Sequence, residues 1–171
     1  LEKFGGPALP SSVDVTWEDR FYPKAWGHPE LRRAITEYYN SQYDSNITPE
    51  NVMIFAGGRP GIYTVMAFLK KHVKVRIGNI EWPAYLDILE QTDTEFQVVP
   101  FTKENNFHPD NSIYFERKGI SANTHLLPVI SNPQNPSGQT RSGDELKELI
   151  EMAEQPGNGI LLDEAYEMFH S

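Results

Sequence analysis

Cysteine is absent from all 171 residues, which excludes disulfide bonds, thiolate metal sites and thiol nucleophiles. Basic residues are few, since 15 lysines and arginines face 24 aspartates and glutamates and leave a net charge of −9. This charge argues against binding to nucleic acid or to an anionic membrane surface, because both attract basic proteins. No apolar run approaches the roughly 20 residues of a membrane-spanning helix, and Leu1-Glu2-Lys3 does not begin a signal peptide. We therefore expect a soluble globular protein with a cytoplasmic location and no bound metal.

The order of the sequence patterns indicates an arm followed by one α/β domain. Residues 1–27 are rich in Gly, Pro and Ser and show no sustained period, so we expect an N-terminal arm or loop. From residue 28 onward, helical patterns alternate with short apolar runs typical of strands. This alternation implies right-handed crossovers and a three-layer α/β/α fold with a mostly parallel sheet over residues 28–171. Strands are expected at residues 52–55, 73–77, 95–100, 126–131 and 160–163, and helices from residue 29, from residue 62, and at residues 84–90, 112–118 and 142–154.

Four groups of residues that can carry chemistry follow predicted strands, where ligands of open α/β sheets gather. The first group is Gly57-Gly58-Arg59, between a strand and a helix. Glycines let backbone N–H groups approach an anion, the helix N-terminus adds its positive end, and Arg59 could form a paired contact with phosphate. The alternative is a tight turn with a surface arginine.

The second group is Glu81-Trp82-Pro83-Ala84-Tyr85, after the next predicted strand. Trp82 offers a flat face suited to stacking on a heteroaromatic ring. A tryptophan packed in a core is the more frequent arrangement, so Trp82 alone does not distinguish a cofactor platform from packing.

The third group is the most specific and runs from Asn132 to Gly138, Asn-Pro-Gln-Asn-Pro-Ser-Gly. Two Asn-Pro pairs and a glycine within seven residues are more than a loop requires. Because a turn needs fewer such residues, a side-chain role is favoured for Asn135, whose amide can donate to a phenolate-type oxygen.

The fourth group, Asp163-Glu164-Ala165-Tyr166, ends the last predicted strand. Asp163 emerges from an apolar run and needs a partner there. A carboxylate aimed at a pyridine nitrogen would hold that nitrogen protonated, and Tyr166 can reach the same ring. A helix-capping aspartate is the alternative for Asp163 alone.

Taken in order, the four groups resemble the class I and II aminotransferases, fold-type-I enzymes that use pyridoxal 5'-phosphate (PLP). The separation of Asn135 from Asp163 along the chain is also typical of that family. Upstream, the segments Tyr22–Gly27 and Leu31–Ala34 resemble the family's Tyr…Gly…Leu-Arg-x-Ala segment. The resemblance runs from about Tyr22 to the C-terminus and implies that residues 28–171 are part of the PLP-binding large domain.

The resemblance also implies an activity, the transfer of an amino group from an α-amino acid to a 2-oxo acid. It implies cofactor-binding roles for eight residues: Gly57, Gly58 and Arg59 at the phosphate, Trp82 on the ring face, Asn135 and Tyr166 at the phenolic oxygen, Asp163 at the pyridinium nitrogen, and Tyr22 at the phosphate of the neighbouring subunit in a homodimer.

The sequence departs from the family pattern in two places. Position 59 is usually a small hydroxyl residue, whereas here Arg59 is followed by Pro60, which has no N–H to donate, and this suggests an unusual subfamily. The family's Schiff-base lysine lies some tens of residues beyond the Asp-x-x-Tyr motif, and this sequence ends at Ser171. A nucleophilic amine is indispensable, so we expect the 171-residue chain alone to have no catalytic residue and to be inactive. Six other lysines do not match the expected context: Lys70, Lys71, Lys74, Lys103, Lys118 and Lys147.

Other functions remain open from the sequence. A PLP-dependent lyase, decarboxylase or oxidase would carry the same motifs, because they bind the cofactor and do not choose the bond that breaks. A non-catalytic binding module could keep the fold without the lysine. An unrelated α/β domain that binds another phosphate ligand would require Trp82, Asn135 and Asp163 to be coincidences.

Overall fold

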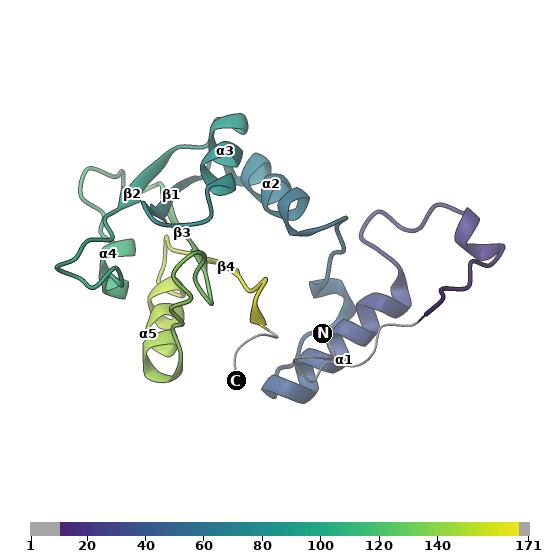
Figure 1. Cartoon of the computed structure of the whole chain (residues 1–171). Helices are drawn as coiled ribbons and strands as arrows, with labels where there is room; N and C mark the ends of the chain where they lie inside the picture. Colours follow the sequence, from purple (N-terminus) through teal and green to yellow (C-terminus); the bar gives the residue numbers. More distant parts are fainter. Residues whose placement is uncertain (1–10, 168–171) are drawn as a thin grey trace. The chain divides into compact units, whose positions relative to one another are not determined.

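The structure is a computed structural model that describes residues 11–167, and the chain divides into two compact units, Leu1–Phe55 and Ala56–Ser171 (Figure 1). In the first unit the described part of the expected arm contains one short 3-10 helix, η2 (Glu18–Arg20). The division of the sequence into an arm of residues 1–27 and a partial large domain of residues 28–171 stays a prediction.

The main helix of the first unit is α1 (Pro29–Tyr43), which confirms the helix predicted from residue 29. Proline occupies the first turn, where its missing N–H costs nothing, and His28 Nδ1 accepts the backbone N–H of Glu30. Arg32 of α1 is buried, and its guanidinium donates to the carbonyl oxygen atoms of Val52, at 2.8 Å, and of Pro49. These bonds fasten α1 to the single 3-10 turn η3 (Pro49–Asn51).

The strand predicted at residues 52–55 is wrong. The segment is extended, but it joins no sheet among residues 11–167, and its Ile54 N–H donates to the Trp26 carbonyl oxygen at 3.0 Å. A strand needs a neighbour along its whole length to satisfy its backbone groups, and a short apolar run does not supply one. The glycine turn at Gly57 is therefore preceded by a loop.

The second unit is built on a four-stranded parallel sheet in the order β2-β1-β3-β4. Its strands are β1 (Val73–Gly78), β2 (Phe96–Val99), β3 (His125–Ser131) and β4 (Leu161–Asp163), so the four strands predicted from residue 73 onward are confirmed within one or two residues. The chain moves from β1 outward to β2 and then returns past β1 to β3. The direction of winding thus reverses between β1 and β3.

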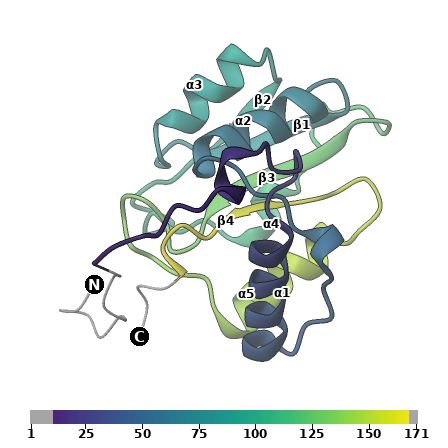
Figure 2. The ribbon, with the colours of Figure 1, turned by 90° about the vertical axis from the view of Figure 1, so that its right-hand side faces the viewer.

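Helices cover both faces of this sheet, which confirms the three-layer α/β/α architecture. Helices α2 (Gly58–Leu69) and α3 (Ala84–Gln91) lie on one face, and α4 (Asn111–Tyr114) and α5 (Gly143–Ala153) lie on the other (Figures 1 and 2). Helix α4 is shorter than predicted, because the chain beyond it forms a loop in which Arg117 donates to carbonyl oxygen atoms. None of the helices among residues 11–167 is long and apolar enough to cross a bilayer.

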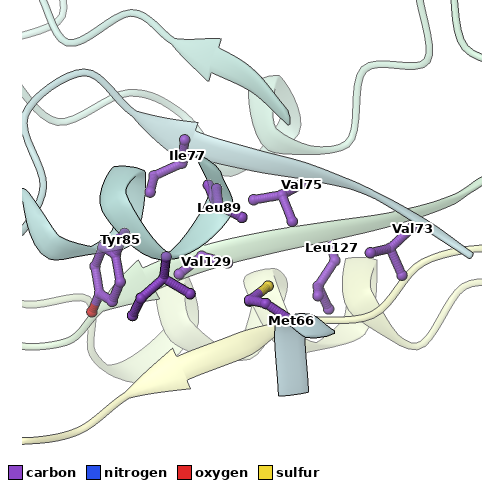
Figure 3. Close-up of a cluster of buried hydrophobic side chains, with 9 residues drawn as sticks. Met66, Val73, Val75, Ile77, Tyr85, Leu89, Leu127 and Val129 are labelled. Carbon is purple, nitrogen blue, oxygen red and sulfur yellow. The ribbon is translucent and has the colours of Figure 1, made fainter. Parts of the chain in front are cut away.

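The core follows the two-residue period of the strands. Alternate residues of β1 and β3 point toward α2 and α3 and form one cluster with them (Figure 3). Tyr85 lies at the end of this cluster with its hydroxyl oxygen pointing away from the aliphatic side chains (Figure 3). Gly78, the last residue of β1, has no room for a side chain, because a Cβ there would lie 2.4 Å from the Phe101 ring. The Phe101 ring thereby favours glycine at the end of β1.

Candidate functional site

One cavity of about 280 Å³ opens at the carboxyl ends of β3 and β4. This is the position that an open α/β sheet provides for ligands, close to the strands between which the winding reverses. Residues from all four predicted groups line the cavity, and its lining consists of Gly58, Arg59, Ile62, Trp82, Tyr85, Ser131, Asn135, Asp163, Ala165 and Tyr166.

The glycine turn forms one rim of the cavity at the start of α2. Gly57 is the residue before the helix, with a φ of 104° that disfavours side chains, and it is not among the lining residues. Gly58 lines the cavity, and a Cβ at this position would meet no atom within 4 Å. The turn therefore leaves open space beside backbone N–H groups at a helix N-terminus, an arrangement suited to an anion.

Arg59 brings the positive charge of this rim. One guanidinium nitrogen lies 3.4 Å from Asp87 Oδ2, and the guanidinium carbon lies 5.9 Å from the centre of the Trp82 ring, within cation–π range. The side chain is about half exposed, so the ion pair with Asp87 is a weak tether. Arg59 can move between this tether and an anion at the turn.

Trp82 belongs both to the cavity and to the core. It is half-buried, packs against the cluster of β1, β3 and α3, and still lines the cavity. Its ring stands at 87° to the ring of Tyr85, with 5.3 Å between the centres. Packing in the core and a position in the cavity wall are thus compatible for Trp82, because the side chain contacts the core cluster and also lines the cavity.

Tyr85 is a site residue for which the sequence predicted no role, although it ends the second group. It is 1% exposed, and its hydroxyl group donates to Asp163 Oδ2 at 2.6 Å. Burial, with the hydrogen bond to Asp163, raises the pKa of the Tyr85 phenol, so the group remains a donor at neutral pH. Asp163 Oδ1 accepts the Ala165 backbone N–H at 3.1 Å, so both carboxylate oxygen atoms are oriented. A sequence signal exists, since Tyr85 follows Trp82 by three residues, at the start of the helix predicted at residues 84–90.

Two residues that precede Asn135 anchor the Asn-Pro loop. Asn132 closes the loop through its side-chain amide, which donates to the Arg141 carbonyl at 3.0 Å and accepts the Arg141 N–H at 2.8 Å. Gln134 is 4% exposed and donates to the Ile80 carbonyl. Directly after these anchors, Asn135 Nδ2 lies 3.4 Å from the Tyr166 hydroxyl oxygen, at the edge of the cavity.

Tyr22, the remaining residue to which the resemblance gave a cofactor role, is not among the residues that line the cavity. Tyr22 belongs to the first unit and its side chain is exposed. No lysine is among the cavity-lining residues of the described chain.

Comparison with protein-family models identifies the family of the chain. Residues 16–171 match the family model described as "Aminotransferase class I and II". The chain belongs to this family. The resemblance drawn from the motifs is thereby confirmed, and the family match covers both compact units of the chain.

Curated relatives in this family are similar over nearly the whole chain. An aspartate aminotransferase from Pyrococcus horikoshii is 35% identical over 95% of this chain and 40% of its own length. An LL-diaminopimelate aminotransferase from Dehalococcoides mccartyi is 28% identical over 95% of this chain and 44% of its own length. The chain thus spans about two fifths of the length of the relatives it matches.

The fold of these enzymes matches as well. The structure of Thermus thermophilus aspartate aminotransferase with maleate is 26% identical over 86% of this chain and 38% of its own, with a TM-score of 0.74. An aminotransferase from Mycobacterium tuberculosis gives a TM-score of 0.75 at 25% identity. The predicted fold class, a part of the fold-type-I large domain, is confirmed.

Proposed function

We propose that the cavity binds PLP and that the protein is an aminotransferase, which transfers an amino group from an α-amino acid to a 2-oxo acid. The observation that carries the proposal is the oriented carboxylate of Asp163 in a cavity that also holds Trp82 and Asn135. A ring nitrogen, a ring face and a phenolic oxygen need these three kinds of partner. The amino-acid substrates named for the relatives belong to those proteins, and the choice among α-amino acids is left open.

The residues present fit the cofactor. Asp163 has two oxygen atoms fixed by Tyr85 and Ala165, with lone pairs remaining for a pyridinium N–H. Asn135 and Tyr166 lie together and would hold the phenolic oxygen, and Trp82 would stack on the ring. The phosphate would meet the open turn at Gly57 and Gly58 and the charge of Arg59, and Tyr22 would reach that phosphate from a partner subunit in a homodimer.

Each side chain then has a defined task. When bound, the cofactor supplies an electron sink that stabilises negative charge at the α-carbon of the amino acid. Asp163 keeps a proton on the ring nitrogen, and Tyr85 keeps Asp163 in place by donating to its Oδ2. Asn135 and Tyr166 fix the phenolic oxygen and so set the rotation of the ring in the cavity. The cytoplasmic location expected from the sequence stays a prediction.

The test is a titration of the protein with PLP, followed by cofactor absorbance. Asp163→Asn keeps the shape but removes the charge, and we expect an affinity about tenfold lower or worse. Glu95→Gln is the matched control, because Glu95 is an exposed carboxylate that pairs with Lys74 away from the cavity. Equal affinities for the two variants would overturn the proposed site. Light scattering tests the homodimer, and a monomer at all micromolar concentrations would contradict it.

A further inference from the structure

A buried carboxyl group lies directly behind the cavity. Glu81 follows β1, is 8% exposed, and accepts a hydrogen bond at Oε2 from Ser131 Oγ at 2.6 Å. Its second oxygen, Oε1, is buried and accepts no hydrogen bond from the residues that the structure describes. A half-satisfied buried carboxyl group is costly, so packing alone does not explain this glutamate.

Ser131 connects this carboxyl group to the cavity wall. Ser131 ends β3, lies opposite Asp163 in the β3–β4 ladder, and lines the cavity. Its hydroxyl group has a single hydrogen, which it gives to Glu81, so a lone pair is left to accept the backbone N–H of Asn135 at 3.0 Å. Glu81 is therefore connected through the Ser131 hydroxyl group to the backbone of Asn135, whose side-chain amide lies at the cavity.

We propose that Glu81 is a positioning residue of the cofactor site, whose carboxylate holds the Asn135 backbone through Ser131 and whose protonation loosens that hold. The inference rests on the proposed function, because the Asn135 amide matters only if it meets the cofactor. It adds a link between proton concentration and cofactor affinity, and it gives a role to Glu81, for which the sequence motifs predicted none.

The charges around Glu81 allow both protonation states near neutral pH. Arg141, 3% exposed, supplies a positive charge that favours the carboxylate. Tyr85 and Tyr114 face Glu81 as neutral phenols, because burial raises the pKa of both, and Asp163 lies behind Tyr85. Burial raises the pKa of Glu81 to about 7, and the hydrogen bond from Ser131 opposes the increase. The group thus changes charge within the range in which enzymes work.

The two states differ in what Ser131 can do. As a carboxylate, Glu81 only accepts, and the charge-assisted bond fixes the Ser131 hydroxyl with its lone pair toward Asn135. As a carboxylic acid, Glu81 carries its own O–H and can donate to Ser131. The Ser131 oxygen then accepts from Glu81 and from the Asn135 N–H on its two lone pairs, and its hydroxyl hydrogen no longer has a charged acceptor that fixes the orientation of the group. The Asn135 backbone is held less firmly in this state.

The experiment measures PLP dissociation constants from pH 5.5 to 8.5 for the full protein, stripped of cofactor, in wild-type and Glu81→Gln forms. The titration of PLP itself affects both proteins equally, so the ratio of their dissociation constants isolates Glu81. We expect a ratio near one at pH 5.5 and a loss of about fivefold in the variant by pH 8.5, the difference between a charged and a neutral hydrogen bond. The PLP affinity of wild type should contain a pH-dependent component that Glu81→Gln lacks. Ser131→Ala should lack this component too.

A second readout needs no cofactor. The Asn135 backbone amide resonance should titrate with a midpoint near pH 7 in wild type and not in Glu81→Gln or Ser131→Ala, whereas Glu95→Gln should behave as wild type. A flat ratio of dissociation constants, or an Asn135 resonance that does not follow Glu81, overturns the inference. Failure of wild type to bind PLP at any pH, with the amide titration intact, overturns the proposed function instead.

Discussion

The Tyr85 hydroxyl group and Asp163 Oδ2 are 2.6 Å apart, although 78 residues separate them along the chain. Tyr85 lies in the first turn of α3 on one face of the sheet, and Asp163 ends β4 at the sheet edge. Because Tyr85 is anchored in the core cluster, it transmits the rigidity of that cluster to the carboxylate. The position of Asp163 therefore depends on more than the short strand that carries it.

This relationship gives a direct prediction for Tyr85→Phe. The change removes one hydrogen bond to a charged group and leaves the ring packed, so we expect PLP affinity to fall about fivefold. The measurement is a PLP titration of both proteins. Tyr63→Phe is the control, since Tyr63 is a tyrosine of α2 outside the cavity lining, and the PLP affinity of this variant should equal that of wild type. Similar losses in the two variants would contradict a specific role for the Tyr85 hydroxyl group.

Gly78→Ala tests the packing that ends β1. The added methyl group would lie 2.4 Å from Phe101 Cε1, so the ring must shift, and we expect a loss of about 1–3 kcal/mol in the free energy of unfolding. Urea denaturation measures this loss. Gly58→Ala is the control, because a Cβ there has open space and the helix gains a better helix former, so stability should hold or rise. A Gly78→Ala protein with the wild-type free energy of unfolding would contradict this prediction, because it would show that the Phe101 ring shifts without cost.

Folding stability should depend on pH through Glu81. The pKa of this carboxyl group rises from 4.5 to about 7 on folding, so the folded state binds the proton more tightly than the unfolded state. The stabilisation is complete below pH 4.5 and is lost as the pH rises toward and through 7. Relative to Glu81→Gln, wild type should lose on the order of 2–3 kcal/mol between pH 4.5 and 8. Denaturation curves of the two proteins check this, and parallel pH profiles would refute it.

Borohydride reduction tests the expected lack of a catalytic lysine in the 171-residue chain. No lysine lines the cavity of the described chain, so PLP bound there should not be trapped on one lysine. Mass spectrometry of the reduced polypeptide should find only scattered, substoichiometric adducts. A stoichiometric adduct on a single lysine would mean that the active site lies elsewhere.

Much of this architecture could be predicted from the sequence, because alternating helix and strand patterns imply a parallel sheet whose carboxyl ends meet at one edge. That is how Trp82, Asn135 and Asp163 were expected to meet, and the structure brings them to one cavity. The strand at residues 52–55 was predicted wrongly, because an apolar run does not reveal whether a neighbour is present to pair with it. The partners of Glu81 and Tyr85 could not be foreseen, because strand order decides which strand ends become neighbours.

The reversal of winding between β1 and β3 has a consequence for how the protein acquires its site. The contacts that build the cavity join residues 50 and 78 positions apart, Ser131 with Glu81 and Asp163 with Tyr85. Such contacts require large loops to close and form late, after local helices and turns. During synthesis, the contact between Tyr85 and Asp163 cannot form until β4 has emerged and docked beside β3. The proposed PLP site would thus be assembled only in a chain whose β4 has already joined β3.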